Sequence, residues 1–129
     1  MIRRLEHGAV WLADFNLRQG TDPGKTHPVL IIQNQALLDA GHTSTLIIPL
    51  TTQLIENAEP LRLRVVARES LEHDSDLLID QIRAIDNQRL TKGPLALLRT
   101  EEMRRIYRAI LEVMGIAIDQ QVAYSINES

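Results

Sequence analysis

Two short polar clusters of the chain contain side chains that can do chemistry. The first is the loop 20–27, Gly-Thr-Asp-Pro-Gly-Lys-Thr-His, in which His27 stands directly before a proline. An imidazole changes its charge near neutral pH, so His27 can act as a general base or a general acid. The second is the run 49–53, Pro-Leu-Thr-Thr-Gln, where Thr51 and Thr52 can donate hydrogen bonds to a developing oxyanion or phosphorane. On spacing alone, the favoured interpretation is simpler: an exposed histidine and an ordinary strand end.

Buried strands are expected to hold both clusters in place. Apolar, β-branched runs too short for helices cover residues 28–33, directly after the first cluster, and residues 44–50, which lead into the second. Residues 34–40 predict a short helical turn between these two strands. Further strands are predicted at residues 8–14, 61–66 and 77–85, with a short strand or extended piece at 89–98 that is broken by Gly93 and Pro94.

The last quarter of the chain predicts one helix. Thr100 is the expected N-cap, because Glu101 and Glu102 follow it in the first turn, where the helix dipole favours anions. Apolar residues then recur at steps of three and four, which predicts that one face packs on the sheet: Met103, Ile106, Tyr107, Ile110, Val113, Met114 and Ala117. Five or six short strands and a terminal helix, without strand–helix alternation, predict an α+β fold with a small, partly closed antiparallel β-barrel.

Composition limits the classes of function. The 129 residues fit a single domain, which we place at residues 1–118 with a polar C-terminal tail at 119–129. The net charge of −3 disfavours bulk electrostatic binding of nucleic acid, so any RNA or DNA site must be local. The absence of cysteine removes disulfides and thiolate chemistry. Residues 1–8 do not fit a secretory signal and no run suits a membrane helix, so we expect a cytoplasmic protein.

No metal or cofactor is expected. The chain lacks the usual phosphate-loop, dinucleotide, nucleophile-elbow and zincin signatures, and its four histidines are scattered without a second ligand at helical spacing. Asp74, Asp76 and Asp80 lie close in sequence, yet the central Gly and terminal Glu of a calcium loop are missing. We therefore expect these aspartates to form a solvated turn before a strand.

Five colinear blocks carry a family resemblance: residues 8–14, 20–22, 27–34, 49–53 and 80–86. They resemble the MazF/PemK toxins of bacterial toxin–antitoxin modules, with a match that extends from residue 8 to residue 118. The resemblance implies an SH3-like barrel with a C-terminal helix and a two-fold homodimer. It also implies a sequence-specific, metal-independent endoribonuclease that cleaves single-stranded RNA at short sequences, leaving 2′,3′-cyclic phosphate and 5′-hydroxyl ends. A cognate antitoxin with an acidic, flexible tail would fill the RNA groove.

The resemblance also assigns roles to single residues. Thr51 matches the catalytic threonine, whereas His27 stands where the family's loop, Gly-Ser-Glu-Gln-x-Gly-x-Arg-Pro, has its catalytic arginine. Imidazole is the better proton acceptor, but it lacks the permanent, forked positive charge of a guanidinium. Lys25 and Arg83 can supply that charge if they face the same groove. The remaining expected contacts to substrate come from Asp22, Thr52, Gln53 and Gln81, while Trp11 and Phe15 are read as core residues that can alternatively stack on a base.

Two alternatives stay open. The replacement of arginine by His27 can leave a relative that binds without cleaving. The same fold also serves CcdB-type toxins, which bind DNA gyrase and do no chemistry of their own. The retained residues 49–53 and the loop blocks favour the ribonuclease.

Overall fold

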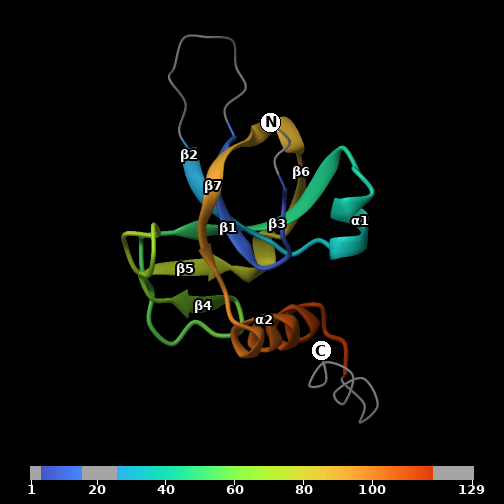
Figure 1. The fold of residues 1–129 in the computed structure, drawn as a ribbon. Coiled ribbons are helices and arrows are strands. Elements are labelled where there is room, and N and C mark those ends of the chain that lie inside the picture. The colour runs from blue at the N-terminus through green and yellow to red at the C-terminus, as the bar shows by residue number, and fades with distance from the viewer. Residues whose placement is uncertain (1–3, 16–25, 118–129) are drawn as a thin grey trace.

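The structure is a computed structural model that describes residues 4–15 and 26–117. Seven strands form one antiparallel sheet with the order β4-β5-β3-β2-β1-β7, and β6 pairs with β3 beside β5. The strands are β1 (Ala9–Asp14), β2 (Thr26–Ile31), β3 (Ser44–Thr51), β4 (Arg62–Val65), β5 (Ser75–Leu78), β6 (Arg83–Asp86) and β7 (Leu90–Leu97). The sheet curls into a partly closed barrel, which confirms the predicted α+β class (Figure 1).

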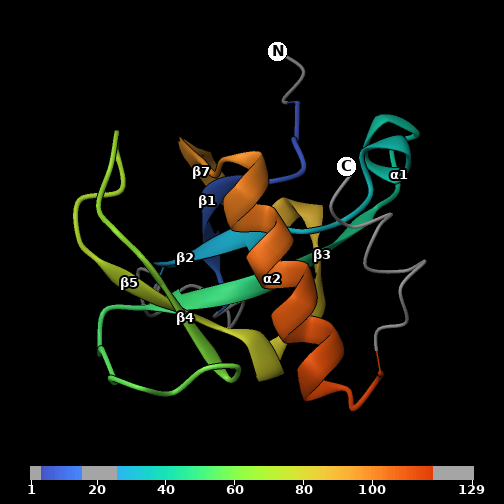
Figure 2. The ribbon, with the colours of Figure 1, turned by 90° about the horizontal axis from the view of Figure 1, so that it is seen from below.

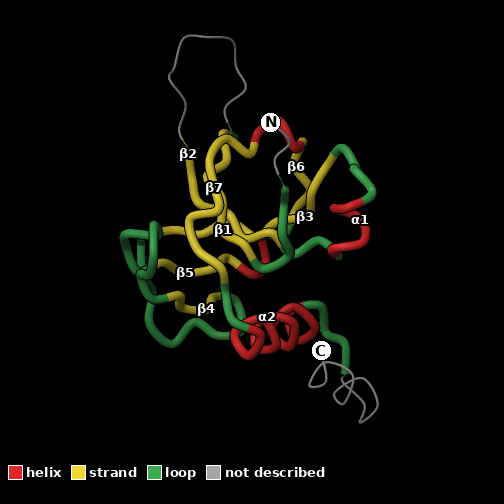
Figure 3. Tube along the Cα trace, viewed as in Figure 1, coloured by secondary structure: helices red, strands yellow, loops and turns green. Residues whose placement is uncertain are grey.

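Two helices and two short 3₁₀ turns complete the fold. Helix α1 (Gln35–Asp39) lies outside the sheet beside β3, and α2 (Thr100–Val113) crosses the sheet on one side (Figures 2 and 3). The predicted helical turn is confirmed as α1, which begins after Asn34 because the Asn34 side chain accepts a hydrogen bond from the Ala36 amide at 2.8 Å. The 3₁₀ turns are η1 (Ile79–Gln81) and η2 (Asn87–Arg89), on either side of β6.

Alternation along the strands divides the buried side chains between two apolar clusters. Leu30 and Ile48 lie in the cluster under α2, with Met103 and Ile106 of that helix. Val29, Ile31 and Ile47, from the same two strands, pack instead in the barrel interior. Trp11 also lies in the barrel interior and is 3% exposed, which confirms its interpretation as a core residue.

Two of the predicted strands were wrong in their extent. Residues 77–85 are not one strand, because the chain turns at η1 where Ile79 is buried, so that β3 pairs first with β5 and then with β6. The piece at 89–98 is not broken: β7 runs through Gly93 and Pro94, and its ladder with β1 absorbs the irregularity as register shifts around Leu12.

The boundaries of the terminal helix also differ from the prediction. The N-cap is Arg99 rather than Thr100, because the Glu102 carboxylate accepts a hydrogen bond from the Arg99 amide at 2.9 Å. Helix α2 ends at Val113, and Gly115 follows with a φ of 74°, so Met114 and Ala117 lie beyond it. Within the described residues, no helix is long and apolar enough to cross a membrane. The predicted tail 119–129 falls outside the described residues.

Candidate functional site

The two predicted catalytic residues stand at the same end of the β2–β3 pair. The register of these strands joins Val29 to Pro49, Leu30 to Ile48 and Ile31 to Ile47. The ladder ends there, and His27 and Thr51 each lie two residues beyond it, past Val29 and Pro49 at this end of the pair. Both positions fall on the face of Val29 and Pro49, since side chains alternate along a strand. His27 is exposed and Thr51 is half-buried, so both can meet a ligand from solvent.

Phe15 connects His27 to Arg83. The Phe15 ring lies with its centroid 6.0 Å from that of the His27 imidazole. The guanidinium carbon of Arg83, at the start of β6, lies 5.1 Å from the centroid of the same ring, which is a cation–π contact. Arg89 holds this end of β1 in place, because its Nη1 donates to the Phe15 carbonyl at 3.2 Å. Strands β2 and β6 and the residue directly after β1 therefore bring an imidazole, a guanidinium and an aromatic ring together.

Arg83 is available as a positive charge. It is exposed, and no ion pair joins it to a carboxylate of the described residues. A guanidinium keeps its charge at every physiological pH and presents a fork of donors that matches a phosphate. The sequence could not show whether Arg83 lies near His27. In the structure both side chains contact the Phe15 ring.

Thr51 shapes the turn that follows β3. Its Oγ1 accepts a hydrogen bond from the Gln53 amide at 3.2 Å, which leaves the hydroxyl proton free to point at a ligand. Arg62 Nη1 donates to the Gln53 carbonyl at 2.9 Å and fixes the turn from the side of β4. The side chains of Thr52 and Gln53 are exposed.

A buried carboxylate anchors the same turn. The prediction of a solvated turn around Asp76 was wrong: Asp76 lies in β5 and is 1% exposed. Its oxygens accept hydrogen bonds from Arg64 Nε at 2.6 Å, from the Ile55 amide at 2.9 Å and from Arg62 Nη1 at 3.3 Å. Burial by itself raises the pKa of Asp76, but these hydrogen bonds outweigh it and the pKa is lowered. Asp76 therefore stays charged and ties the residues after Thr51 to β4 and β5.

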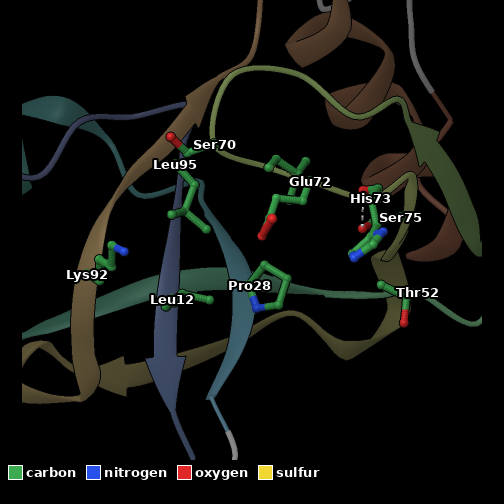
Figure 4. A pocket seen from close by; sticks show the side chains of 10 residues that line it. Leu12, Pro28, Thr52, Ser70, Glu72, His73, Ser75, Lys92 and Leu95 are labelled. Carbon is green, nitrogen blue, oxygen red and sulfur yellow. Dashed lines mark hydrogen bonds between the residues drawn. The ribbon is translucent and has the colours of Figure 1, made fainter.

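A pocket of about 520 Å³ opens on the opposite face of β2. Pro28 of β2 and Leu12 of β1 line its floor, and Thr52 stands at one edge (Figure 4). The loop between β4 and β5 contributes Glu72 and His73. Thr51 therefore lies on the same face as His27, whereas its neighbour Thr52 lines the pocket on the other face.

The structure brings some of the predicted site residues together and not others. His27 and Arg83 meet at the Phe15 ring, and Thr51 lies at the same end of the β2–β3 pair as His27, with Thr52 and Gln53 directly after it. Gln81 is exposed in η1, two positions before Arg83, and its side chain forms no hydrogen bond with any of these residues. Asp22 and Lys25 lie outside the described residues, so their placement stays a prediction.

Sequence reasoning missed the pocket. No motif in the sequence marks Glu72 or His73 as part of a site. The available signal is Leu71, a single apolar residue in a polar stretch, which is 5% exposed and fixes the loop against the core. Nowhere in residues 4–15 and 26–117 do three or more histidine, cysteine, aspartate or glutamate side chains form a group that could hold a metal ion.

Comparisons with known proteins show the family to which the chain belongs. Residues 6–114 match the family model described as PemK-like, MazF-like toxin of type II toxin-antitoxin system. The chain is 35% identical over 120 residues to the Endoribonuclease MazF of Staphylococcus saprophyticus, covering 90% of this chain and 93% of that protein.

Solved structures share the fold. A MazE-MazF structure from Deinococcus radiodurans superposes with a TM-score of 0.72 at 16% identity, covering 90% of this chain and all of that one (100%). The Mycobacterium tuberculosis toxin MazF-mt6 has a TM-score of 0.68 at 21% identity, covering 85% of this chain and 99% of its own. With the family match over most of its length and a relative above 30% identity, the chain belongs to the PemK-like, MazF-like toxins of type II toxin–antitoxin systems.

Proposed function

We propose that the chain is the toxin of a toxin–antitoxin module and acts as a metal-independent endoribonuclease on single-stranded RNA. The observation that carries the proposal is the placement of His27 and Thr51 at the same end of the β2–β3 pair, with Arg83 and His27 on the same Phe15 ring. The name of the staphylococcal relative, Endoribonuclease MazF, supports it.

RNA carries its own nucleophile in the 2′-hydroxyl, so cleavage needs no metal-bound water. In the proposed reaction, the His27 imidazole accepts the 2′-hydroxyl proton as the 2′-oxygen bonds to phosphorus. The bond from phosphorus to the 5′-oxygen breaks, and that oxygen leaves with a proton from solvent. The products are a 2′,3′-cyclic phosphate and a 5′-hydroxyl.

Thr51 and Arg83 would stabilise the charge that grows on the phosphoryl oxygens. The Thr51 hydroxyl has a proton to donate, because its oxygen already accepts from the Gln53 amide. Arg83 provides the permanent positive charge that an imidazole cannot. Preorganised donors of this kind are a large term in enzymatic transition-state stabilisation.

The remaining predicted residues would bind the RNA strand. Thr52, Gln53 and Gln81 are exposed on the described part of the surface and can hydrogen-bond to base edges. Asp22 and Lys25 would contribute from the loop before β2. Phe15 is half-buried and offers an aromatic ring on which a base can stack.

We also propose the assembly that the family suggests. Solved neighbours include a mycobacterial endoribonuclease in complex with its cognate antitoxin, at 19% identity and a TM-score of 0.66 over 92% of this chain and 100% of that one. By analogy the chain would form a homodimer in the cytoplasm, neutralised by an antitoxin with an acidic segment. Residues 1–118 would form the toxin domain and residues 119–129 a tail.

Cleavage in the presence of a chelator tests the proposal. The full-length chain is incubated with long single-stranded RNA and excess EDTA, and the fragment ends are analysed. We expect discrete fragments ending in cyclic phosphate, with Thr51→Ala slower by about 100-fold. Thr43→Ala, an exposed threonine just before β3, is the matched control and should cleave normally. The proposal fails if EDTA abolishes cleavage or if Thr51→Ala matches wild type, while RNA binding without cleavage would favour a binding-only toxin.

A further inference from the structure

The pocket beside Thr52 has the construction of a ligand site. Its floor is a row of neighbours across three strands, since Leu12 of β1 pairs with Pro28 of β2 on one side and with Lys92 of β7 on the other. Leu95 closes the apolar wall. A volume of about 520 Å³ with an apolar floor and a few polar groups is typical of sites for small ligands.

Two opposite charges face this space from different elements. Figure 4 shows the Glu72 carboxylate turned into the pocket from the β4–β5 loop, with Lys92 on the β7 wall. Neither side chain has a hydrogen bond or ion pair with any of the described residues, in contrast to the paired carboxylates of Asp76 and Glu102. A carboxylate only accepts hydrogen bonds and an ammonium only donates them, so the pair suits a ligand that presents donors and an acceptor.

We propose that this pocket is a base subsite that selects guanine, with Glu72 as the specificity-determining residue. The inference rests on the proposed function, because it assumes that a single RNA strand passes the adjacent Thr51. Thr52 stands at the edge of the pocket and follows Thr51 directly, so a base turned into the pocket belongs to a nucleotide near the scissile phosphate.

The hydrogen-bonding edges of the four bases distinguish guanine. Its Watson–Crick edge presents two adjacent donors, N1–H and the N2 amino group, which match the two oxygens of one carboxylate, and its O6 accepts from an ammonium. Uracil offers one N–H between two carbonyls, and adenine and cytosine place a ring nitrogen acceptor beside their amino group. Each of these three would bring an acceptor against the Glu72 carboxylate. Unstacked bases of single-stranded RNA are read on such edges.

The apolar floor of the pocket can contact the face of a bound base. A base that leaves the RNA stack loses contact on both faces, and Pro28 and Leu12 offer an apolar surface in return. The ring of Pro28 is fixed by its backbone, and β1 and β2 hold both residues in a paired ladder. The floor is therefore preorganised, and the base is chosen by the charges at the rim.

Binding of strands that cannot be cleaved separates this subsite from catalysis. Seven-nucleotide deoxyuridine oligonucleotides lack the 2′-hydroxyl, and a single central guanine can slide into the subsite in any register. We would measure by titration calorimetry the affinity of the full chain for oligonucleotides whose central base is guanine, hypoxanthine, adenine or uracil. Hypoxanthine keeps N1–H and O6 but lacks the N2 amino group.

The variants tested are Glu72→Gln and Glu69→Gln, two neutralisations in the same loop, of which Glu69 is exposed and does not line the pocket. We expect wild type and Glu69→Gln to prefer guanine by about tenfold over adenine, with hypoxanthine intermediate, as a two-point contact to one base allows. Glu72→Gln should reduce that preference to about twofold or less.

The outcomes are decisive in either direction. The subsite is wrong if wild type shows no preference for guanine, if Glu72→Gln keeps the full preference, or if no oligonucleotide binds. If guanine is preferred but unmodified RNA is not cleaved, the subsite stands and the proposed nuclease activity fails. If RNA is cleaved with no difference between guanine and adenine strands, the nuclease stands and the subsite fails.

Discussion

The guanidinium carbon of Arg83 lies 5.1 Å from the centroid of the Phe15 ring, and the same ring contacts the His27 imidazole at 6.0 Å between centroids. A residue of β6 thus places a permanent cation next to the position where the family resemblance expects an arginine and the sequence has a histidine. In the proposed reaction the two functions of that arginine, proton transfer and charge, are divided between His27 and Arg83.

Removal of the Arg83 charge should therefore slow cleavage. We expect Arg83→Gln to reduce the single-turnover rate on single-stranded RNA by about 100-fold, because the growing phosphoryl charge loses a fixed cation. Arg105→Gln removes an exposed arginine that pairs with Glu59 on the outer side of α2, and it should cleave at the wild-type rate. Equal rates for wild type and Arg83→Gln would show that Arg83 takes no part.

The Asp76 anchor predicts a loss of stability together with a loss of activity. Asp76→Asn leaves Arg64 and Arg62 without their buried carboxylate, and we expect the free energy of unfolding to fall by about 3 kcal/mol in urea titrations. The turn after Thr51 also loses an anchor at Ile55, so cleavage should slow under conditions where the variant is folded. Asp80→Asn, an exposed aspartate in η1, should change neither quantity, and an unchanged midpoint for Asp76→Asn would contradict the assignment.

The pair of Glu102 and Arg68 predicts an acid-dependent stability. The two hydrogen bonds from Arg68, at 2.6 and 2.7 Å, lower the pKa of Glu102 from 4.5 to about 2, against the opposing effect of burial. Because the folded-state pKa is the lower one, the pair contributes stability above pH 4.5, and this contribution is lost as the pH falls toward about 2.

Glu102→Gln should accordingly cost about 2 kcal/mol of unfolding free energy at pH 7 and much less near pH 2.5. The measurement is urea unfolding of wild type and variant at several pH values. Glu101→Gln, whose side chain is 72% exposed, is the control and should be nearly neutral throughout. A cost for Glu102→Gln that stays constant with pH would exclude the ion pair as its origin.

Strands β2 and β3 could be predicted because each is a compact apolar run. The two buried runs at 28–33 and 44–50 became β2 and β3 within a few residues, and their antiparallel pairing places His27 and Thr51 at the same end. The division of residues 77–85 into β5 and β6 could not be read in the same way. Ile79 is as apolar as its neighbours, so the sequence does not mark the turn there. The turn separates β5, which pairs with the end of β3, from β6, which pairs with its beginning.

The sequence could predict which residues belong to the site, but not which of them contact each other. His27 and Thr51 follow from their positions at strand ends, whereas the contact of Arg83 with Phe15 joins residues 68 positions apart that only the closed sheet brings together. The prediction for Asp76 was wrong because its burial depends on Arg62 and Arg64 of the neighbouring strand. The acidic residues around Asp76 in the sequence give no sign of those partners. The Glu72 pocket depends in the same way on how its loop folds over β1 and β2.

Chemical rescue of a His27 variant is the most direct test of the account. Single-turnover cleavage of single-stranded RNA in EDTA is compared for wild type, His27→Ala and His27→Arg, with and without added imidazole. The account predicts cleavage by wild type, a loss of roughly 100-fold or more in His27→Ala, and partial recovery of that variant by free imidazole. Full activity of His27→Ala, or an inactive wild type beside an active His27→Arg, would contradict the assignment of proton transfer to His27.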